Sequence, residues 1–452
     1  MVRARLAADI GGTFTDVVLE RAGRRHSVKV LTTPRAPEEG MLEGIARVLA
    51  AAGIAPGDVG VLIHGTTLAT NALIERKGAR TALVTTAGFR DVLEMGYEKR
   101  YEHYDLDLEL PAPLVPRELR FPVEERMTAK GMVRTPLDEK SFPGLISELK
   151  KNRVEAVAIG FLHSYANDAH ERRAGEILAA RLPGVAITLS SAVCPEIREY
   201  ERFSTACANA YVQPLMASYL ERLAAELARR GMRCPVYLMT SGGGLTTLET
   251  ARRVPVRLIE SGPAGGAILS AGLAREMGLD EVLSFDMGGT TAKVCFIGQG
   301  RPEQSRKFEV ARVWRNLKGS GLPVRIPVTE MVEIGAGGGS IARLDAMQRI
   351  QVGPASAGAE PGPACYCRGG EEPTVTDADV VLGRIDPGRS PAVRFDWIFS
   401  KQKKPSWPAS ASPWSSMRAG PRPASAKSSR KTWRAPRGCT PSSAARSPSA
   451  AP

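Results

Sequence analysis

Two short stretches with nearly the same residues could bind phosphate and a metal ion. The first runs Asp9-Ile-Gly-Gly-Thr13 and the second Asp286-Met-Gly-Gly-Thr290. Each follows an apolar run and precedes another, which predicts a strand, a tight turn and a second strand. Glycine in such a turn lets backbone N–H groups approach an anion, because no Cβ stands in the way. The threonine hydroxyl adds a donor, and the aspartate can hold a metal ion or its water shell.

The repetition of this stretch is what favours a functional role. A single Asp-Gly-Gly turn could be an ordinary structural hairpin with a capping aspartate. Two copies, one in each half of the chain, favour one turn from each half closing on a single phosphate chain. We therefore predict a phosphate cradle made of Gly11, Gly12, Thr13, Gly288, Gly289 and Thr290. No G-x-x-x-x-G-K-[ST] motif occurs, which excludes a P-loop as the phosphate site.

The elements that must position these residues follow an α/β pattern. Residues 4–31 predict three strands, with the first Gly-Gly turn between two of them. Apolar residues at helical spacing predict a helix over 37–52. Strand 59–63 then brings His64 to its carboxyl end, where α/β sheets place ligands. A catalytic His64, for substrate orientation or proton transfer, and a structural histidine are about equally compatible with this position.

Six motifs resemble those of the hydantoinase A/oxoprolinase family, in the family's order, over residues 1 to about 388. They are Asp9-Ile-Gly-Gly-Thr-Phe-Thr-Asp16, His64-Gly-Thr-Thr-Leu-Ala-Thr-Asn71, Ser261-Gly-Pro-Ala-Gly-Gly266, Ser284-Phe-Asp-Met-Gly-Gly-Thr290, Gly335-Ala-Gly-Gly-Gly-Ser-Ile-Ala342 and Pro361-Gly-Pro-Ala-Cys-Tyr366. The paired hairpins are also similar to those of the acetate kinase, sugar kinase, heat-shock chaperone and actin superfamily. This resemblance implies an α/β fold of duplicated ribonuclease-H-like lobes, with ATP in the interlobe cleft.

The resemblance also implies roles for single residues. Asp9 and Asp286 would be catalytic and hold Mg²⁺ through water, because phosphoryl transfer depends mainly on positioning and charge neutralisation. The loop after the second hairpin would contact adenosine. Its residues are Gly335, Gly337, Gly338 and Gly339. Many relatives have Ser-Thr-Asp after the second Gly-Gly-Thr, whereas this chain has Thr291-Ala-Lys293. Lys293 could complement phosphate charge or point to solvent from an edge strand.

The activity that the resemblance implies is ATP-dependent hydrolysis of a small cyclic amide, of the hydantoin or oxoproline type, through phosphorylation of the ring carbonyl. The chain would be the A subunit of a cytoplasmic hetero-oligomer with a hydantoinase B-like subunit. Two alternatives stay open. One is the A-like subunit of an ATP-dependent acetone- or acetophenone-type carboxylase. The other is a truncated, non-catalytic product that still binds nucleotide.

The composition changes abruptly near residue 389. We expect an N-terminal lobe over 1–190, an incomplete second lobe over 191–388, and a disordered basic tail over 389–452. The tail is rich in Ser, Ala, Pro, Lys and Arg without apolar periodicity, which suggests translation in a shifted reading frame; a genuine disordered tail is the alternative. Residues 95–135, rich in Tyr, Pro and charge, predict an excursion from the first lobe.

Charge, hydropathy and cysteine content argue against several other functions. Residues 389–452 hold 13 of the 61 Lys and Arg residues and one of the 48 acidic residues. The preceding residues are therefore nearly neutral, which argues against nucleic-acid binding. No stretch has the length of a membrane span. The seven scattered cysteines predict reduced thiols, and the lack of a second close pair argues against a zinc site.

Overall fold

The computed structural model describes residues 3–12, 14–33, 36–97, 100–312, 318–358 and 360–386. Two predictions fall outside these residues, namely Thr13 of the phosphate cradle and the tail over 389–452. The described residues form an α/β fold with mixed and parallel sheets, which confirms the predicted class.

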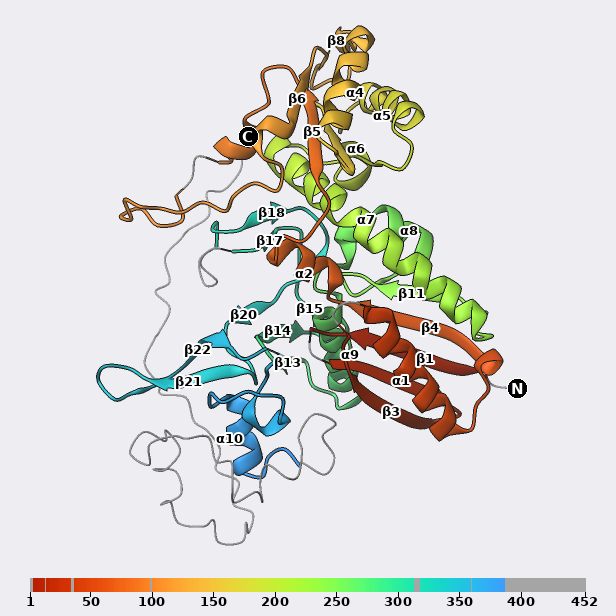
Figure 1. Cartoon of the computed structure of the whole chain (residues 1–452), viewed down its shortest axis with the longest axis vertical. Coiled ribbons are helices and arrows are strands. Elements are labelled where there is room, and N and C mark those ends of the chain that lie inside the picture. Colours follow the sequence, from red (N-terminus) through yellow and green to blue (C-terminus); the bar gives the residue numbers. More distant parts are fainter. Residues whose placement is uncertain are drawn as a thin grey trace, which may run out of the picture. The chain divides into compact units, whose positions relative to one another are not determined.

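The first sheet has six strands in the order β12-β11-β4-β1-β2-β3 (Figure 1). They are β1 (Ala4–Ile10), β2 (Phe14–Arg21), β3 (Arg24–Leu31), β4 (Val59–Thr66), β11 (Val236–Met239) and β12 (Leu245–Thr247). Strands β1, β2 and β3 are antiparallel to one another in sequence order. Strand β4 runs parallel to β1, and β11 runs parallel to β4. Every second side chain of β1 is buried, including Leu6 and Ala8. Asp9 therefore points to the face opposite this core.

Helix α1 (Pro37–Ala52) has the bounds that its apolar spacing predicts. Proline at its first position and Gly53 in the left-handed conformation after its last turn delimit it. Its Met41 and Ile45 side chains are buried in one core with Leu6 of the first sheet. The helix thereby covers the apolar face of the strands that carry the first hairpin.

The second sheet has four parallel strands in the order β10-β9-β5-β6. They are β5 (Thr81–Thr86), β6 (Arg120–Val123), β9 (Ala156–Gly160) and β10 (Ala186–Leu189). Every residue of β5 and β9 is buried, as is typical of parallel strands covered on both faces. The accompanying elements are α3 (Val92–Met95), α4 (Phe142–Lys151), α5 (Ala169–Arg181), α6 (Ser190–Val193), β7 (Arg126–Met127) and β8 (Val133–Thr135).

Helix α7 (Glu199–Arg229) is shared by two hydrophobic cores. Near its start it buries Phe203 and Cys207 with residues of the second sheet, and further along it buries Tyr219 and Leu223 with residues of the first. In Figure 1 the helix lies between these two sheets. Pro214 lies inside α7 without dividing it.

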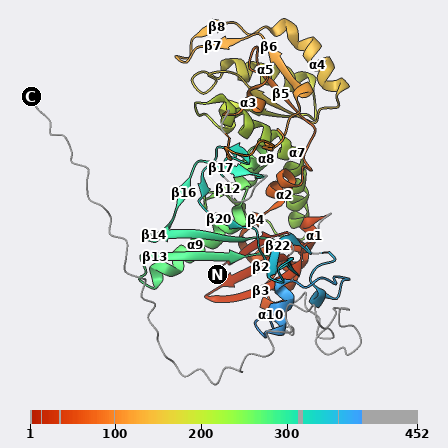
Figure 2. The same ribbon diagram turned by 90° about the vertical axis from the view of Figure 1, so that its left-hand side faces the viewer.

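A third sheet packs against helix α9 (Ser261–Glu276). Its strands are β13 (Glu281–Met287), β14 (Ala292–Gly298), β15 (Arg301–Pro302) and β20 (Val332–Ile334), and β13 and β14 lie side by side in Figure 2. One face of the sheet buries Cys295 and Ile297 against α9 residues such as Ala271. The other face leaves large apolar side chains exposed, which are Leu283, Phe285, Met287, Phe296, Val332 and Ile334.

The remaining elements are short. The strands are β16 (Gln304–Ser305), β17 (Phe308–Val310), β18 (Leu322–Val324), β19 (Val328–Thr329), β21 (Ser340–Leu344) and β22 (Ile350–Ser356). The helices are α2 (Leu68–Ile74), α8 (Leu248–Arg253) and α10 (Val375–Val381), with single 3₁₀ turns at Pro56–Asp58, Arg117–Leu119, Glu139–Ser141, Pro255–Leu258 and Ala364–Tyr366. Across the described residues, no helix, long or short, has both the length and the apolar character that crossing a membrane requires.

Candidate functional site

Asp9 lies at the end of β1, where three strands meet. The Gly11 N–H donates to the Phe14 carbonyl oxygen at 2.9 Å, which closes the tight turn between β1 and β2. In the sheet, Asp9 is opposite Asp16 on β2 and Gly65 on β4. A Cβ on Gly65 would lie 2.4 Å from Asp9 Oδ1, so glycine leaves the room that the carboxylate occupies.

The first turn of α9 is fixed against the same place. The Ser261 hydroxyl donates to the Thr66 carbonyl oxygen at 3.1 Å, and its oxygen accepts from the Thr66 N–H at 3.3 Å. Gly262 follows, and a Cβ there would lie 3.1 Å from Asp9 Oδ2. The positive end of this 16-residue helix therefore lies beside Asp9.

The Asp9 side chain is largely but not fully buried, and one of its carboxylate oxygens is buried without a hydrogen-bond partner. Its Oδ1 atom has no hydrogen-bond partner within the described part of the chain. Burial, and after it the negative charges of Asp16 and Asp286, raise the pKa of Asp9 to about 6. A buried carboxylate oxygen without a donor costs free energy, which a cation would compensate. Asp9 therefore suits a hard divalent ion or its water shell.

The second hairpin approaches the same face of α9. The Gly288 N–H donates to the Thr291 carbonyl oxygen at 2.9 Å, as in the first turn. Asp286 is exposed, and a Cβ on Gly266 would lie 4.0 Å from its Oδ2 atom. Gly262 and Gly266 are four residues apart, so they share one helix face. Both predicted metal ligands border this glycine face of α9.

The glycine-rich loop before β21 packs on the second hairpin. The Gly338 N–H donates to the Gly288 carbonyl oxygen at 2.9 Å. A Cβ on Gly337 would lie 2.7 Å from the backbone of Thr290, so the two backbones are in close contact. The structure thereby brings together these predicted residues: Gly288, Gly289, Thr290, Gly337, Gly338 and Gly339, with Gly335 at the start of the loop.

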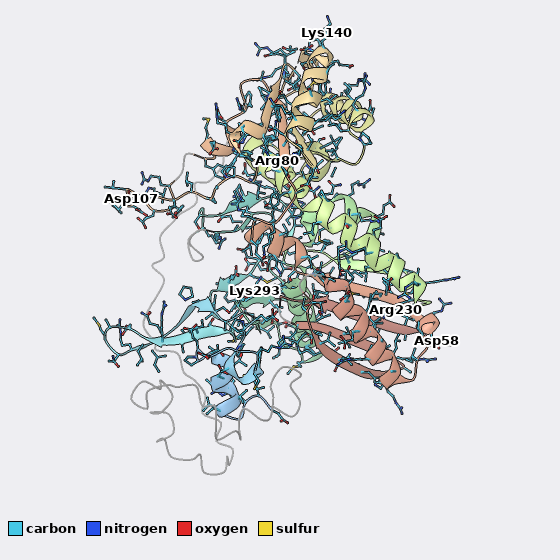
Figure 3. The ribbon with its side chains drawn as sticks, in the orientation of Figure 1. Asp58, Arg80, Asp107, Lys140, Arg230 and Lys293 are labelled. Carbon is cyan, nitrogen blue, oxygen red and sulfur yellow. The ribbon has the colours of Figure 1, made fainter. Side chains whose placement is uncertain are left out.

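Lys293 has a partner that the sequence did not predict. It is opposite Asp286 on β13 and opposite Glu333 on β20, so its strand has neighbours on both sides. Its ammonium group forms an ion pair with Glu260, and the two side chains are only 14% and 17% exposed. Figure 3 labels the position of Lys293. Burial lowers the pKa of Lys293. The interpretation that Lys293 points to solvent from an edge strand is therefore wrong.

His64 is fully buried, and both of its ring nitrogens have protein partners. Nδ1 lies 3.1 Å from the Ala8 carbonyl oxygen and Nε2 lies 2.8 Å from the Tyr219 hydroxyl of α7. Burial lowers the pKa of His64 to about 4, so the ring is neutral at neutral pH. These contacts favour the structural alternative. The sequence contained a sign of this burial. His64 is two residues after Leu62 in the same strand, so the two side chains lie on the same, buried face of the sheet.

The donor set of this site suits one kind of metal ion. Among the described residues, no group of three or more His, Cys, Asp or Glu side chains could hold a metal ion. Asp9 and Asp286 are two carboxylates beside tight turns rich in backbone N–H groups. Mg²⁺ is commonly bound by one or two carboxylates, with water and phosphate oxygens as its other ligands. The residues present therefore fit a magnesium–phosphate complex.

Two models of known protein families together match most of the chain. A family model described as hydantoinase/oxoprolinase matches residues 202–392, and a model of the N-terminal region of hydantoinase/oxoprolinase matches residues 5–182. Caprolactamase subunit alpha of Pseudomonas jessenii is 38% identical over 393 residues, which cover 85% of this chain and 55% of that protein.

Two solved structures resemble this one over most of its length. The crystal structure of ATP-dependent caprolactamase from Pseudomonas jessenii has a TM-score of 0.72 and 36% identity, and the match covers 87% of this chain and 57% of that chain. A nucleotide-free structure of acetone carboxylase has a TM-score of 0.72 and 26% identity, covering 86% and 56%. The chain spans about half the length of the caprolactamase and acetone carboxylase chains that it matches.

Proposed function

This chain belongs to the hydantoinase/oxoprolinase family, and from that premise we propose that it serves the ATP-dependent hydrolysis of a small cyclic amide. The observation that carries the proposal is the approach of Asp9 and Asp286 to one glycine face of α9. Similarity to a caprolactamase subunit and to the structure of an ATP-dependent caprolactamase supports the reaction type. The proposed substrates are rings of the hydantoin or oxoproline type.

The proposed fold assignment is a pair of duplicated ribonuclease-H-like lobes of the acetate kinase, sugar kinase, heat-shock chaperone and actin superfamily. The lobes would span 1–190 and 191–388, with ATP in the cleft between them. Support comes from the likeness of the two hairpins. Each joins two antiparallel strands, β1 with β2 and β13 with β14, and each has its aspartate at the same place before the turn.

The geometry of the site supports the binding roles that we propose. Asp9 and Asp286 would hold Mg²⁺, or water bound to it, because the Asp9 carboxylate has an oxygen without a donor. The glycine turns and threonines 13 and 290 would surround phosphate, and the loop from Gly335 to Gly339 would contact adenosine. When bound, Mg²⁺ and ATP supply a transferable phosphoryl group with partly neutralised charge. If Lys293 were released from its ion pair with Glu260, its ammonium group would add a positive charge near the phosphoryl group.

The proposed chemistry overcomes amide resonance, which protects the ring carbonyl from water. Transfer of the γ-phosphoryl group to the carbonyl oxygen weakens this resonance and makes the carbon open to attack. Water adds to that carbon, the ring carbon–nitrogen bond breaks, and the nitrogen takes a proton. A second water releases phosphate, so each ring opened consumes one ATP. The chain's residues hold the phosphoryl donor and acceptor in place, which is the main need of this reaction.

A second subunit is part of the proposal. The similar caprolactamase chain is named as a subunit, which supports a multi-subunit enzyme. We propose a hydantoinase B-like partner in a hetero-oligomer, with the ring opening shared between the two subunits. A second candidate function is a subunit of an ATP-dependent acetone- or acetophenone-type carboxylase, which the equal TM-score of the acetone carboxylase structure favours.

The test compares ADP release by the full chain, with and without a hydantoinase B-like subunit. The added substrates are hydantoin, 5-oxoproline, caprolactam, and acetone with bicarbonate. Stimulation by a cyclic amide is expected, and stimulation by acetone and bicarbonate alone would select the carboxylase. Asp9→Asn and Asp286→Asn should each abolish the stimulated rate while circular dichroism stays unchanged. Full activity in both variants would overturn the assignment of the site.

A further inference from the structure

The ion pair between Glu260 and Lys293 connects two parts of the fold. Glu260 directly precedes the first turn of α9, and its backbone N–H donates to the Thr70 hydroxyl of α2 at 3.1 Å. Lys293 lies on β14. The Glu260 and Lys293 side chains are 17% and 14% exposed, so the pair keeps some surface that a ligand can reach.

Both members of the pair border the predicted metal ligands. Gly262 is two residues after Glu260, and a Cβ on Gly262 would lie 3.1 Å from Asp9 Oδ2. Lys293 is the cross-strand neighbour of Asp286, and such neighbours point to the same face of a sheet. The ion pair therefore lies where the two hairpins approach α9.

The helix face beside the pair has room for a ligand group. A Cβ on Gly266 would approach no described atom outside its own part of α9 more closely than Asp286 Oδ2, at 4.0 Å. The glycines of α9 thus leave space between the helix and the second hairpin.

The backbone at Glu260 is held in an unfavourable conformation. Its φ is 60°, in the left-handed region that glutamate seldom adopts. Its N–H donates to Thr70, and its carbonyl oxygen accepts the Ala264 N–H at 3.3 Å, so hydrogen bonds on both sides hold it there. Strain that the surrounding structure maintains is common at binding sites.

Two other carboxylates lie nearby. Asp16 forms an ion pair with Lys29 at 2.7 Å. Glu333 on β20 is the other cross-strand neighbour of Lys293, but β14 separates β20 from β13. Two strand spacings, about 10 Å, therefore lie between Glu333 and the aspartate of the second hairpin. Glu260, which borders the glycine face of α9, is the better placed acceptor for a ligand at this site.

A cyclic amide presents its N–H and its carbonyl oxygen on the same edge. The amide group is planar, and a small ring forces it into the cis form, whereas an open-chain secondary amide is trans and points the two groups to opposite sides. A ring whose carbonyl oxygen faces a phosphoryl donor therefore has its N–H beside that donor. A carboxylate at this place can hold the ring by a charge-assisted hydrogen bond.

We propose that Glu260 binds the N–H group of the cyclic amide and thereby orients the carbonyl oxygen toward the phosphoryl donor. In the free protein Lys293 occupies the Glu260 carboxylate. When nucleotide is bound, Lys293 turns to the phosphate and leaves this carboxylate open to the ring. The inference rests on the proposed function, from which it takes the ring and the nucleotide.

The test is calorimetric titration of the full chain with two pairs of neutral rings. The pairs are caprolactam with N-methylcaprolactam, and hydantoin with 1,3-dimethylhydantoin, whose methylated members lack the N–H group. Each titration is made with and without Mg²⁺ and a non-hydrolysable ATP analogue. With the analogue, an N–H ring should bind at least about tenfold more tightly than its methylated form, which corresponds to about 1.4 kcal/mol.

Three results would overturn the proposal. They are equal binding of both members of each pair, a preference of the same size without the analogue, and no binding of any ring at millimolar concentration. The second result counts because Lys293 blocks Glu260 in the free protein.

Variants separate the hydrogen bond from the bulk of the methyl group. Glu260→Gln keeps the size of the side chain but offers a neutral acceptor, so the preference should fall to about threefold or less. A preference that stays at tenfold would be steric and would reject the proposal. Glu333→Gln removes a negative charge beside the same lysine, is the matched control, and should keep the preference. If Glu260→Gln does not fold, the dependence on the analogue in the unmodified protein decides.

Failure of the proposed function would give a different pattern. An N–H preference that depends on Glu260, with ADP release that no ring stimulates, would reject the reaction and leave the ring-binding site. Ring-stimulated ADP release without such a preference would leave the reaction and reject the role of Glu260.

Discussion

Replacing Asp9 by asparagine is expected to stabilise the protein at neutral pH while it abolishes Mg²⁺-dependent nucleotide binding. The reason is the burial of a charged carboxylate with an oxygen that no donor satisfies. The pKa of Asp9 rises from 3.8 to about 6 on folding. Below pH 3.8 the group is protonated in the folded and unfolded states alike, so it adds no cost. Between pH 3.8 and about 6 the unfolded state ionises while the folded state stays protonated, so the folded protein loses stability over this range, and above about 6 the loss is complete.

The size of the effect follows from the shift in pKa. The pKa of Asp9 differs by about 2 units between the folded and unfolded states, which corresponds to about 3 kcal/mol in the free energy of unfolding. Asp9→Asn removes this cost, so its gain should approach that value at pH 7.5 and vanish near pH 4. Urea unfolding at several pH values measures it. Asp58→Asn, at an exposed aspartate, is the matched control and should show no pH-dependent gain.

Ligand binding should invert the order of stability. Mg²⁺ and ATP are expected to raise the melting temperature of the unmodified protein and to leave that of Asp9→Asn unchanged, because the compensating cation then has only one carboxylate. A variant that is less stable than the unmodified protein at every pH would refute the reasoning, since it would show that the Asp9 carboxylate is compensated in the free protein.

Three further changes test the site and the sheets around it. Gly65→Ala places a Cβ 2.4 Å from Asp9 Oδ1, so the carboxylate must turn away, and calorimetry should show Mg²⁺–ATP binding weakened by roughly tenfold or more. Lys293→Met leaves Glu260 charged without its partner and should cost about 3 kcal/mol in urea unfolding, most of which Glu260→Gln in the double variant should recover. Phe285→Ser, on the exposed apolar face of the third sheet, should reduce self-association measured by light scattering.

Matched controls make these results decisive. Gly57→Ala adds a Cβ that meets no atom within 4 Å and should leave nucleotide binding unchanged. Leu106→Ser changes an apolar residue that is 93% exposed outside the third sheet, and it should not alter association. Additive costs for Lys293→Met and Glu260→Gln would contradict the ion pair, because paired residues couple.

Local patterns predicted the hairpins and the first helix. The Gly-Gly turns after Asp9 and Asp286 demand close backbone approach, and α1 ends at the glycine that its sequence provides. Such signals lie within a few residues of one another, so the chain's local geometry determines them. The meeting of the two aspartates was predictable only because the motif is repeated.

Contacts between distant segments gave no comparable signal. Glu260 and Lys293 pair across 33 positions, and no periodicity links them. The composition of residues 95–135 predicted an excursion from the first lobe. However, β6, which belongs to this segment, is a strand of the second sheet and pairs with β5. Its Arg120 is buried there because the Val115 carbonyl oxygen accepts from its guanidinium at 2.9 Å. A buried arginine in a strand needs such a partner, which a sequence pattern does not contain.

Helix α7 has a consequence for how the protein comes apart. It contributes Phe203 to one core and Tyr219 to the other, and Tyr219 also holds His64 of β4 at 2.8 Å. If α7 detaches from one sheet, apolar residues of the other core are exposed as well. Because α7 is one continuous hydrogen-bonded helix, the stabilities of the two cores are coupled. Heating should therefore melt both sheets in a single cooperative transition, with near- and far-ultraviolet circular dichroism changing at the same temperature.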